Sequence, residues 1–178
     1  RYTARDHDMK NLRQVVDRIG KAAEGAAMGT GTRVEYLMTA DNVPSLYSRT
    51  LSEVTHRNLQ ALPPITYSEE EVEFAKALSN EYAPGTERIV GRYSHRAKAP
   101  GATDVGHVSH VTPTVRIYAF SWVPGSSHNW KAVASSGHSI GEHGMMQAAK
   151  AVAISAIDFY NDPSLVEKAR QELIKDRG

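Results

Sequence analysis

The order in which β-rich runs and helical patterns follow one another constrains the fold of this chain most. Residues 1–5, RYTAR, alternate as a strand does, and residues 8–24 place apolar side chains at helical spacing behind the capping residue Asp8. Residues 32–39, TRVEYLMT, alternate again and are rich in β-forming types. Such a strand–helix–strand unit is too small to bury a core alone, so we expect it to belong to a larger α/β layer.

Helical patterns recur through the rest of the chain. Two S-x-x-E sequences, Ser68 with Glu71 and Ser139 with Glu142, predict capping boxes at the starts of two helices. Asp162 precedes a proline in the arrangement that caps a final amphipathic helix. The predicted helices cover residues 48–62, the segment after Ser68, residues 139–160 and the segment after Pro163.

A β-rich run and two connecting segments lie between these helices. Residues 115–123, VRIYAFSWV, predict a strand that Pro113 precedes and Pro124 follows. The turn at residues 41–44 is a candidate crossover between domains. Residues 83–100 contain glycine, proline and basic groups and predict a long loop, a kind of segment that is often functional.

Charge and cysteine content exclude several classes of function. The formal net charge is +1 over 178 residues with no basic stripe among aromatic residues, which disfavours a nucleic-acid partner. The longest apolar stretch, residues 148–159, is too short and too polar to cross a membrane. The absence of cysteine excludes disulfides, thiolate zinc sites and thiol nucleophiles, and fits a cytoplasmic protein. Any metal in this chain would need histidine, aspartate or glutamate ligands.

Six of the eight histidines fall between residues 95 and 143, together with Asp104 and Glu142. Neutral imidazole is a common metal ligand and needs no cysteine partner, so the cluster is a candidate site. Taken singly, most histidines in loops are merely exposed. The six are His95, His107, His110, His128, His138 and His143.

The segment GATDVGHVSHVTPT, residues 101–114, places an acid and two histidines three residues apart. Its glycines, proline and β-branched residues argue against a helix, and residues three apart on an extended segment face opposite ways. Asp104, His107 and His110 are therefore not expected to converge on one ion. For His138 and His143, which flank the start of the long helix, we expect capping or exposure.

His128 follows a predicted strand and the turn at residues 124–127, where α/β proteins place loops that contact ligands. No nucleophile elbow, phosphate-binding loop or H-E-x-x-H helix accompanies it. The residues alone predict an α/β protein with a candidate His/carboxylate metal site.

Three motifs resemble one enzyme family. GATDVGHVSHVTPT, PGSSHNW and SIGEHGMMQAAKAVAISAIDFYNDP are similar to the C-terminal part of the zinc amidohydrolases and metallopeptidases related to carboxypeptidase G, aminoacylase and indole-acetyl-amino-acid hydrolase. AEGAAMGTGTRVEYL resembles the second domain of the aminobenzoyl-glutamate hydrolase subgroup. The resemblance covers nearly the whole chain in order.

The resemblance implies an α/β fold in two parts. Residues 1–44 would be the last strand–helix–strand of an inserted lid and dimerisation domain. Residues 45–178 would be the C-terminal half of a mixed-sheet, zinc-peptidase-like catalytic domain. It also implies a cytoplasmic homodimer, with the missing N-terminal half of the catalytic domain as a further partner.

The implied reaction is hydrolysis of an amide bond in a small substrate, an N-acyl amino acid or an aminobenzoyl-glutamate-like compound. In this family two zinc ions, or manganese, activate the attacking water. By resemblance His128 is a metal ligand, and Asp104, His107 and His110 line the cleft. His107 stands where the subgroup has Asp or Asn. The resemblance places no catalytic residue within the chain and most metal ligands before Arg1, so we expect the chain alone to be inactive.

Two alternatives remain open. One is a non-catalytic interaction or auxiliary subunit that keeps the fold without a full metal site. The other is a self-contained hydrolase with one zinc ion bound by His107, His110 and His128, which suits the cluster but not the expected backbone geometry.

Overall fold

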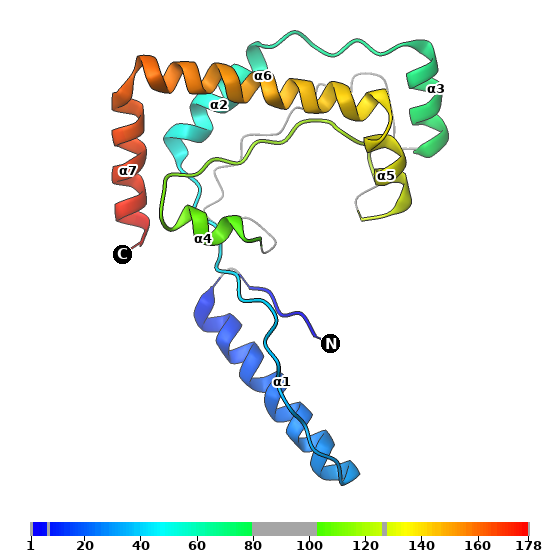
Figure 1. Cartoon of the computed structure of the whole chain (residues 1–178), viewed down its shortest axis with the longest axis vertical. Helices are drawn as coiled ribbons and strands as arrows, with labels where there is room; N and C mark the ends of the chain where they lie inside the picture. Colours follow the sequence, from blue (N-terminus) through cyan, green and yellow to red (C-terminus); the bar gives the residue numbers. More distant parts are fainter. Residues whose placement is uncertain (1, 7, 80–102, 126–127, 178) are drawn as a thin grey trace. The chain divides into compact units, whose positions relative to one another are not determined.

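The regular structure of the chain is helical wherever the computed structural model describes it (Figure 1). The described residues are 2–6, 8–79, 103–125 and 128–177. The predictions made for the loop at residues 83–100 and for His95 lie outside them. Seven helices are present in the described ranges: α1 Met9–Thr30, α2 Arg49–Ala61, α3 Glu69–Leu78, α4 Val105–Ser109, α5 Trp130–Ser136, α6 Ser139–Asn161 and α7 Pro163–Arg177.

The expected α/β fold is wrong, because no strand forms within the described ranges. Residues 32–39 and residues 115–121 are neither helical nor paired into a ladder. β-branched and aromatic residues favour a strand only where a neighbouring strand supplies partners for the backbone N–H and C=O groups. The described residues offer these segments no such neighbour, so neither the mixed-sheet catalytic domain nor the strand–helix–strand of a lid is formed there.

The chain divides into two compact units. Unit 1 consists of Arg1–Tyr47, Arg96–Thr114 and Leu173–Gly178, and unit 2 consists of Ser48–His95 and Val115–Glu172. We describe each unit by itself. The assignment of residues 1–44 to a lid and 45–178 to a catalytic domain stays a prediction.

Helix α1 in unit 1 begins at the predicted cap and ends later than expected. Asp8 is the N-cap residue, and its carboxylate accepts hydrogen bonds from backbone N–H groups of the first turn. The helix was expected to end near Glu24, before Gly25, but it continues to Thr30. A glycine inside a helix costs only about 1 kcal/mol relative to alanine, so Gly25 does not break it. Gly31 ends it by adopting the left-handed conformation, with φ 65°.

The segment after α1 returns along the helix (Figure 1). The Tyr36 hydroxyl donates a 2.7 Å hydrogen bond to the backbone carbonyl of Gly20 and lies 3.3 Å from the Glu24 carboxylate. No residue of α1 is buried. Polar contacts rather than a core therefore connect these two parts of unit 1.

Helices α2 and α6 of unit 2 are joined by polar side chains beside apolar ones. The Asn58 side-chain amide donates to the Ser155 hydroxyl at 3.1 Å and to the Asp158 carboxylate at 2.8 Å. Arg57 also pairs with Asp158, at 3.1 Å. The expected bounds of α2 are confirmed within one residue, and three of its apolar residues are buried: Leu51, Val54 and Leu59.

A small core in unit 2 joins α3 and α6 with the segment that precedes α5. Its buried members are Ala75, Leu78, Val123 and Ile140. A Cβ atom on Gly144 of α6 would lie 2.0 Å from the Phe120 carbonyl oxygen, so only glycine permits this close approach. The extended segment therefore rests directly on the backbone of α6.

Helix α6 ends within one residue of its expected boundary, but its start differs in detail. Ser139 was predicted to cap it in a box with Glu142, whereas His138 occupies the N-cap position and makes no side-chain capping bond. No helix in the described part of the chain is both long and apolar enough to span a membrane.

Candidate functional site

The segment that carries Asp104, His107 and His110 is partly helical, which corrects the expectation of an extended loop. Asp104 is the N-cap residue of α4, and its carboxylate accepts a 3.1 Å hydrogen bond from the N–H of Val105. The backbone of α4 packs closely against Val43 at Gly106. A Cβ atom at this position would lie 2.0 Å from the Val43 carbonyl oxygen, so glycine is required there.

Both histidines of this segment hold the backbone of residues 41–44. His107 Nε2 lies 2.7 Å from the Asp41 carbonyl oxygen, and His110 Nε2 lies 3.0 Å from the Pro44 carbonyl oxygen. A carbonyl oxygen only accepts, so each Nε2 carries the proton and donates. The two imidazoles thus tie α4 to the preceding segment of unit 1, and their role as cleft residues stays a prediction.

His128, the predicted metal ligand, belongs to unit 2 and not to the unit that holds α4. Its side chain is exposed, and its backbone has a φ of 60°, a conformation rare for residues other than glycine. Strained backbone of this kind collects at functional sites, although the angle alone assigns no function. Within the described ranges no group of three or more His, Asp or Glu side chains could hold a metal ion.

A polar cluster in unit 2 surrounds Glu71 on α3. The carboxylate is buried and accepts a 2.7 Å hydrogen bond from the Ser68 N–H, which confirms the predicted capping box. The hydroxyl of Ser139 and Nε2 of His143, both on α6, donate to its other oxygen, His143 at 3.1 Å. Glu71 therefore joins the start of α3 to the first turn of α6.

These donors decide the charge of Glu71. Burial acts to raise the pKa of its carboxyl group, but hydrogen bonds from Ser139 and Ser68 and the interaction with His143 outweigh burial and lower the pKa. A carboxylate with a lowered pKa and saturated acceptors is a poor proton acceptor at neutral pH. The geometry thus favours Glu71 as an ionised structural group over a general base.

His138 stands next to this cluster. Its ring stacks on the Phe74 ring with centroids 4.1 Å apart and an interplanar angle of 10°. The Ser139 hydroxyl gives its proton to Glu71, so at 3.2 Å it accepts from Nδ1 of His138. The expectation of capping or exposure for these two histidines is met only in part: His138 occupies the N-cap position without a side-chain capping bond, the His143 side chain is 42% exposed, and both rings also join α3 to α6.

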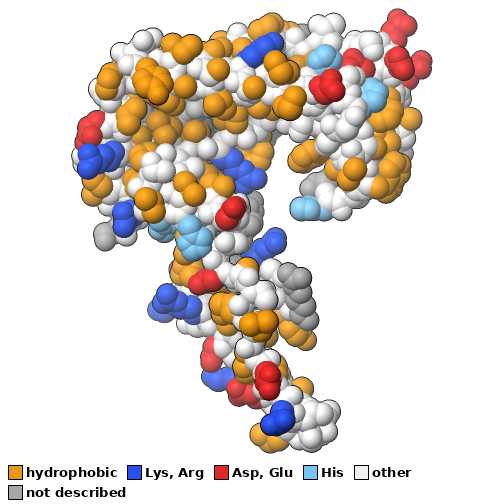
Figure 2. All heavy atoms as spheres, in the orientation of Figure 1, with side chains coloured by type: hydrophobic (Ala, Val, Ile, Leu, Met, Phe, Trp, Pro, Cys, Tyr) orange, Lys and Arg blue, Asp and Glu red, His pale blue; other side chains and the backbone are white. Residues whose placement is uncertain are grey.

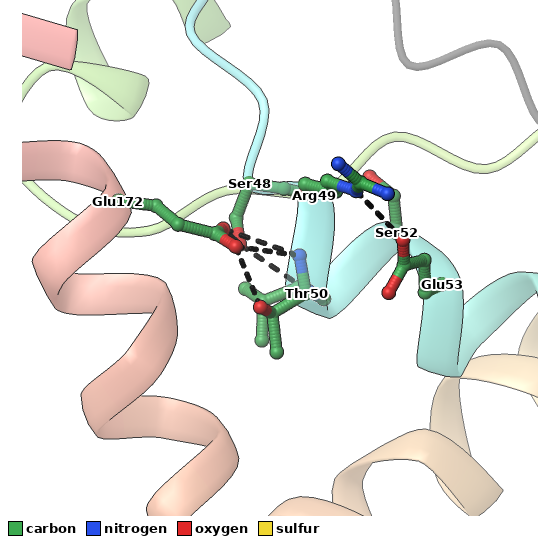
Figure 3. A network of polar contacts seen from close by, with 7 residues as sticks. Ser48, Arg49, Thr50, Ser52, Glu53 and Glu172 are labelled. Atoms are coloured by element: carbon green, nitrogen blue, oxygen red, sulfur yellow. Dashed lines mark hydrogen bonds and ion pairs between the residues drawn. The ribbon is translucent and has the colours of Figure 1, made fainter.

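A second carboxylate, Glu172 on α7, organises the start of α2 (Figure 3). It accepts from the Ser48 hydroxyl at 2.7 Å, the Thr50 hydroxyl at 2.6 Å and the Thr50 N–H at 3.1 Å. Burial acts to raise its pKa, but these hydrogen bonds and one from the Arg49 backbone lower it. The negative charge also lies at a helix N-terminus, where the helix dipole favours it.

Sequence reasoning identified the starts of α2 and α3 but missed both carboxylate clusters. The S-x-x-E pattern marked Ser68 and Glu71, and Ser48 lay at an expected helix start. Nothing in the local pattern linked Glu71 to His143 or Thr50 to Glu172, because 72 and 122 residues separate the partners.

Two curated proteins are similar to most of this chain. One is a component of the p-aminobenzoyl-glutamate hydrolase of Escherichia coli (strain K12), 29% identical over 201 residues, which cover 96% of this chain and 42% of that protein. The other is the Xaa-Arg dipeptidase of Mus musculus, 23% identical over 171 residues, which cover 96% of this chain and 35% of that protein. The chain thus spans less than half the length of the curated relatives it matches. No protein-family model and no solved structure matches it.

Proposed function

We propose that these 178 residues contribute to a hydrolase that cleaves an amide bond in a small substrate. The observation that carries the proposal is the similarity, over 96% of the chain, to two proteins whose names describe hydrolysis of aminobenzoyl-glutamate and of Xaa-Arg dipeptides. Both named substrates join an amino acid through an amide bond. We therefore propose an N-acyl amino acid, an aminobenzoyl-glutamate-like compound or a dipeptide as the substrate class.

The finer proposal is that zinc, or manganese, takes part and that His128 is the ligand that this chain contributes. The exposed imidazole and the similarity to a metal-binding motif support His128. The described residues do not fit a complete metal site, because none of them form a group of three candidate ligands. We derive no step of the reaction through a metal, and we expect the chain alone to be inactive.

A homodimer and a cytoplasmic location remain part of the proposal. Self-association is tested by the sedimentation velocity of the protein, and location by fractionation of the cells that produce it.

Hydrolysis is tested on the 178-residue chain and on the polypeptide encoded by the whole open reading frame that contains it. Each is incubated with p-aminobenzoyl-glutamate and with an Xaa-Arg dipeptide, and the released amino acid is measured by chromatography. We expect no turnover by the chain alone and turnover by the encoded polypeptide. An encoded polypeptide that binds partners but cleaves neither substrate would contradict the proposal and support the auxiliary subunit.

The role of His128 is tested separately in the polypeptide that turns over. His128→Ala is expected to lower its metal content, measured by mass spectrometry of the dialysed protein, and to abolish hydrolysis. His56→Ala, which removes a histidine from α2 of the same unit, is the matched control and is expected to retain metal and activity. Equal metal content in the two variants would overturn the assignment.

A further inference from the structure

The backbone at His128 is held in a conformation that its side chain disfavours. Its φ is 60°, and in the described part of the chain no other residue except glycine has a positive φ. A Cβ atom in this region comes too close to the following carbonyl oxygen, so the conformation persists only where neighbouring contacts impose it. Figure 2 shows histidine side chains in pale blue at the molecular surface, and the His128 imidazole is exposed. Contacts of the neighbouring residues are therefore the ones that can hold this backbone.

The chain before His128 is anchored in the core of unit 2. Val123 is fully buried. Ser79, a buried residue directly after α3, donates through its hydroxyl to the Pro124 carbonyl oxygen at 2.8 Å. Gly125 follows with a φ of 70°, which glycine adopts without strain. The chain therefore leaves the core at a fixed point three residues before His128.

Asn129 fixes the chain after His128 and reaches back across it. Its side-chain oxygen caps α5 by accepting from the Lys131 N–H at 2.9 Å. Its side-chain NH₂ group donates to the Gly125 carbonyl oxygen at 3.5 Å. The two contacts use opposite ends of the amide, so together they fix its orientation. One side chain thus links the backbone on both sides of His128.

We infer that Asn129 is a positioning residue, whose amide holds the His128 backbone in the left-handed conformation and so fixes the direction of the imidazole. The inference deepens the proposed function and rests on it, since His128 is the ligand that this chain is proposed to contribute. A site residue held in one direction by its neighbours loses less conformational freedom when it binds. The contact between Asn129 and Gly125 is long and exposed, so its effect falls on this loop and not on the folding of unit 2.

Two variants separate the two contacts of Asn129. Asn129→Ser retains a good N-cap residue for α5 but is too short to reach Gly125, whereas Asn129→Ala loses both contacts. Asn161→Ser, at an exposed position near the end of α6, is the matched control. The conformation of His128 is measured in the histidine-labelled 178-residue chain by the intraresidue NOE between its amide and α protons. This NOE is strong in the left-handed conformation because the two protons lie close together there.

We expect a strong NOE at His128 in the wild type and in Asn161→Ser, and a weak one in both Asn129 variants. The urea midpoint of Asn129→Ser should match that of the wild type. A strong NOE in Asn129→Ser would overturn the inference, even if Asn129→Ala loses it, because the helix cap would then suffice. A weak NOE in the wild type, or its loss in Asn129→Ser only together with a lower urea midpoint, would overturn it as well.

A double-mutant cycle tests the same contact through stability. Replacing His128 by glycine relieves the left-handed strain but adds conformational freedom to the unfolded chain. In the wild-type background we expect the relief to dominate, so that His128→Gly lowers the equilibrium constant of unfolding by roughly 3-fold. In the Asn129→Ser background this backbone has already relaxed, so the same replacement should raise that constant. Equal effects of His128→Gly in the two backgrounds would overturn the inference.

The proposed function fails or stands on a different measurement. Unchanged metal content of His128→Ala in the encoded polypeptide would refute His128 as a ligand. The NOE and the cycle would still decide whether Asn129 holds the backbone of His128.

Discussion

Replacing Glu172 by alanine should destabilise unit 2 more than any replacement of an exposed acid on the same helix. The variant removes a carboxylate at the start of α2. This carboxylate accepts hydrogen bonds from the Ser48 hydroxyl, the Thr50 hydroxyl and the Thr50 N–H. The variant leaves the N–H of Thr50, a buried residue, without this acceptor. The favourable contact between a negative charge and the helix N-terminus is lost as well.

The size of the effect follows from these contacts. A hydrogen bond to a charged group contributes about 1.5–3 kcal/mol, but bonds that share one carboxylate are not additive. Glu172 is partly exposed, so water replaces some of what is lost. We expect a loss of about 2–3 kcal/mol in the free energy of unfolding. For a chain of this size that corresponds to a fall in Tm of about 5–10 °C.

The assay can be confined to the unit that contains the change. The two tryptophans of the chain, Trp122 and Trp130, both belong to unit 2, so urea unfolding followed by tryptophan fluorescence at pH 7 reports on it. Glu167→Ala is the matched control, because Glu167 is exposed and its contacts with the described residues are an ion pair at 3.8 Å and a hydrogen bond, both within α7. The control should change stability by less than about 0.5 kcal/mol. If the free energies of unfolding of the two variants differ by less than about 0.5 kcal/mol, the reasoning about Glu172 is refuted.

Two further predictions concern a close approach and a titration. Gly144→Ala should destabilise the chain by about 1–3 kcal/mol in urea unfolding followed by circular dichroism, because its Cβ would lie 2.0 Å from a backbone oxygen. Gly25→Ala, whose Cβ meets nothing within 4 Å inside α1, should instead stabilise by up to about 1 kcal/mol, and a loss of the same size in both variants would contradict the steric argument. Glu71 has a pKa lowered from 4.5, so its contribution to stability is complete above that pH and is lost as the pH falls through the lower folded-state value. Glu71→Gln should therefore lose less stability than the wild type between pH 6 and pH 3.5, and parallel losses would disprove the linkage.

The starts of α1, α2 and α3 could be predicted from the sequence because their determinants are local. Ser68 and Glu71 satisfy each other across one helical turn, and the Asp8 carboxylate caps the backbone directly after it. Such contacts need no distant partner, so a short pattern is sufficient to predict them. The start of α2 after Ser48 was predictable for the same reason.

The strands could not be predicted in the same way, because a strand depends on a neighbour. The segment TRVEYLMT has the alternation and residue types of a strand, yet Tyr36 contacts α1 instead of a second strand. Pattern and propensity describe a surface suited to pairing, and pairing requires another segment beside it. The exposed apolar residues of α6 illustrate a related limit, since helical spacing predicts an apolar face but not what will cover it.

The carboxylate clusters also required long-range geometry, and their chemistry bears on function. Glu71 and Glu172 accept several donors at helix starts, and the imidazoles of His107 and His110 donate to backbone carbonyls. A carboxylate that accepts several donors must lose some of them before it can bind a metal or accept a proton, whereas an imidazole that donates through Nε2 still has the lone pair of Nδ1. The side chain of His128 is exposed in unit 2, as are those of Asp104 and His107 in unit 1. In the described part of the chain these polar groups thus hold helices and loops in place, and the inactivity of the isolated chain stays a prediction.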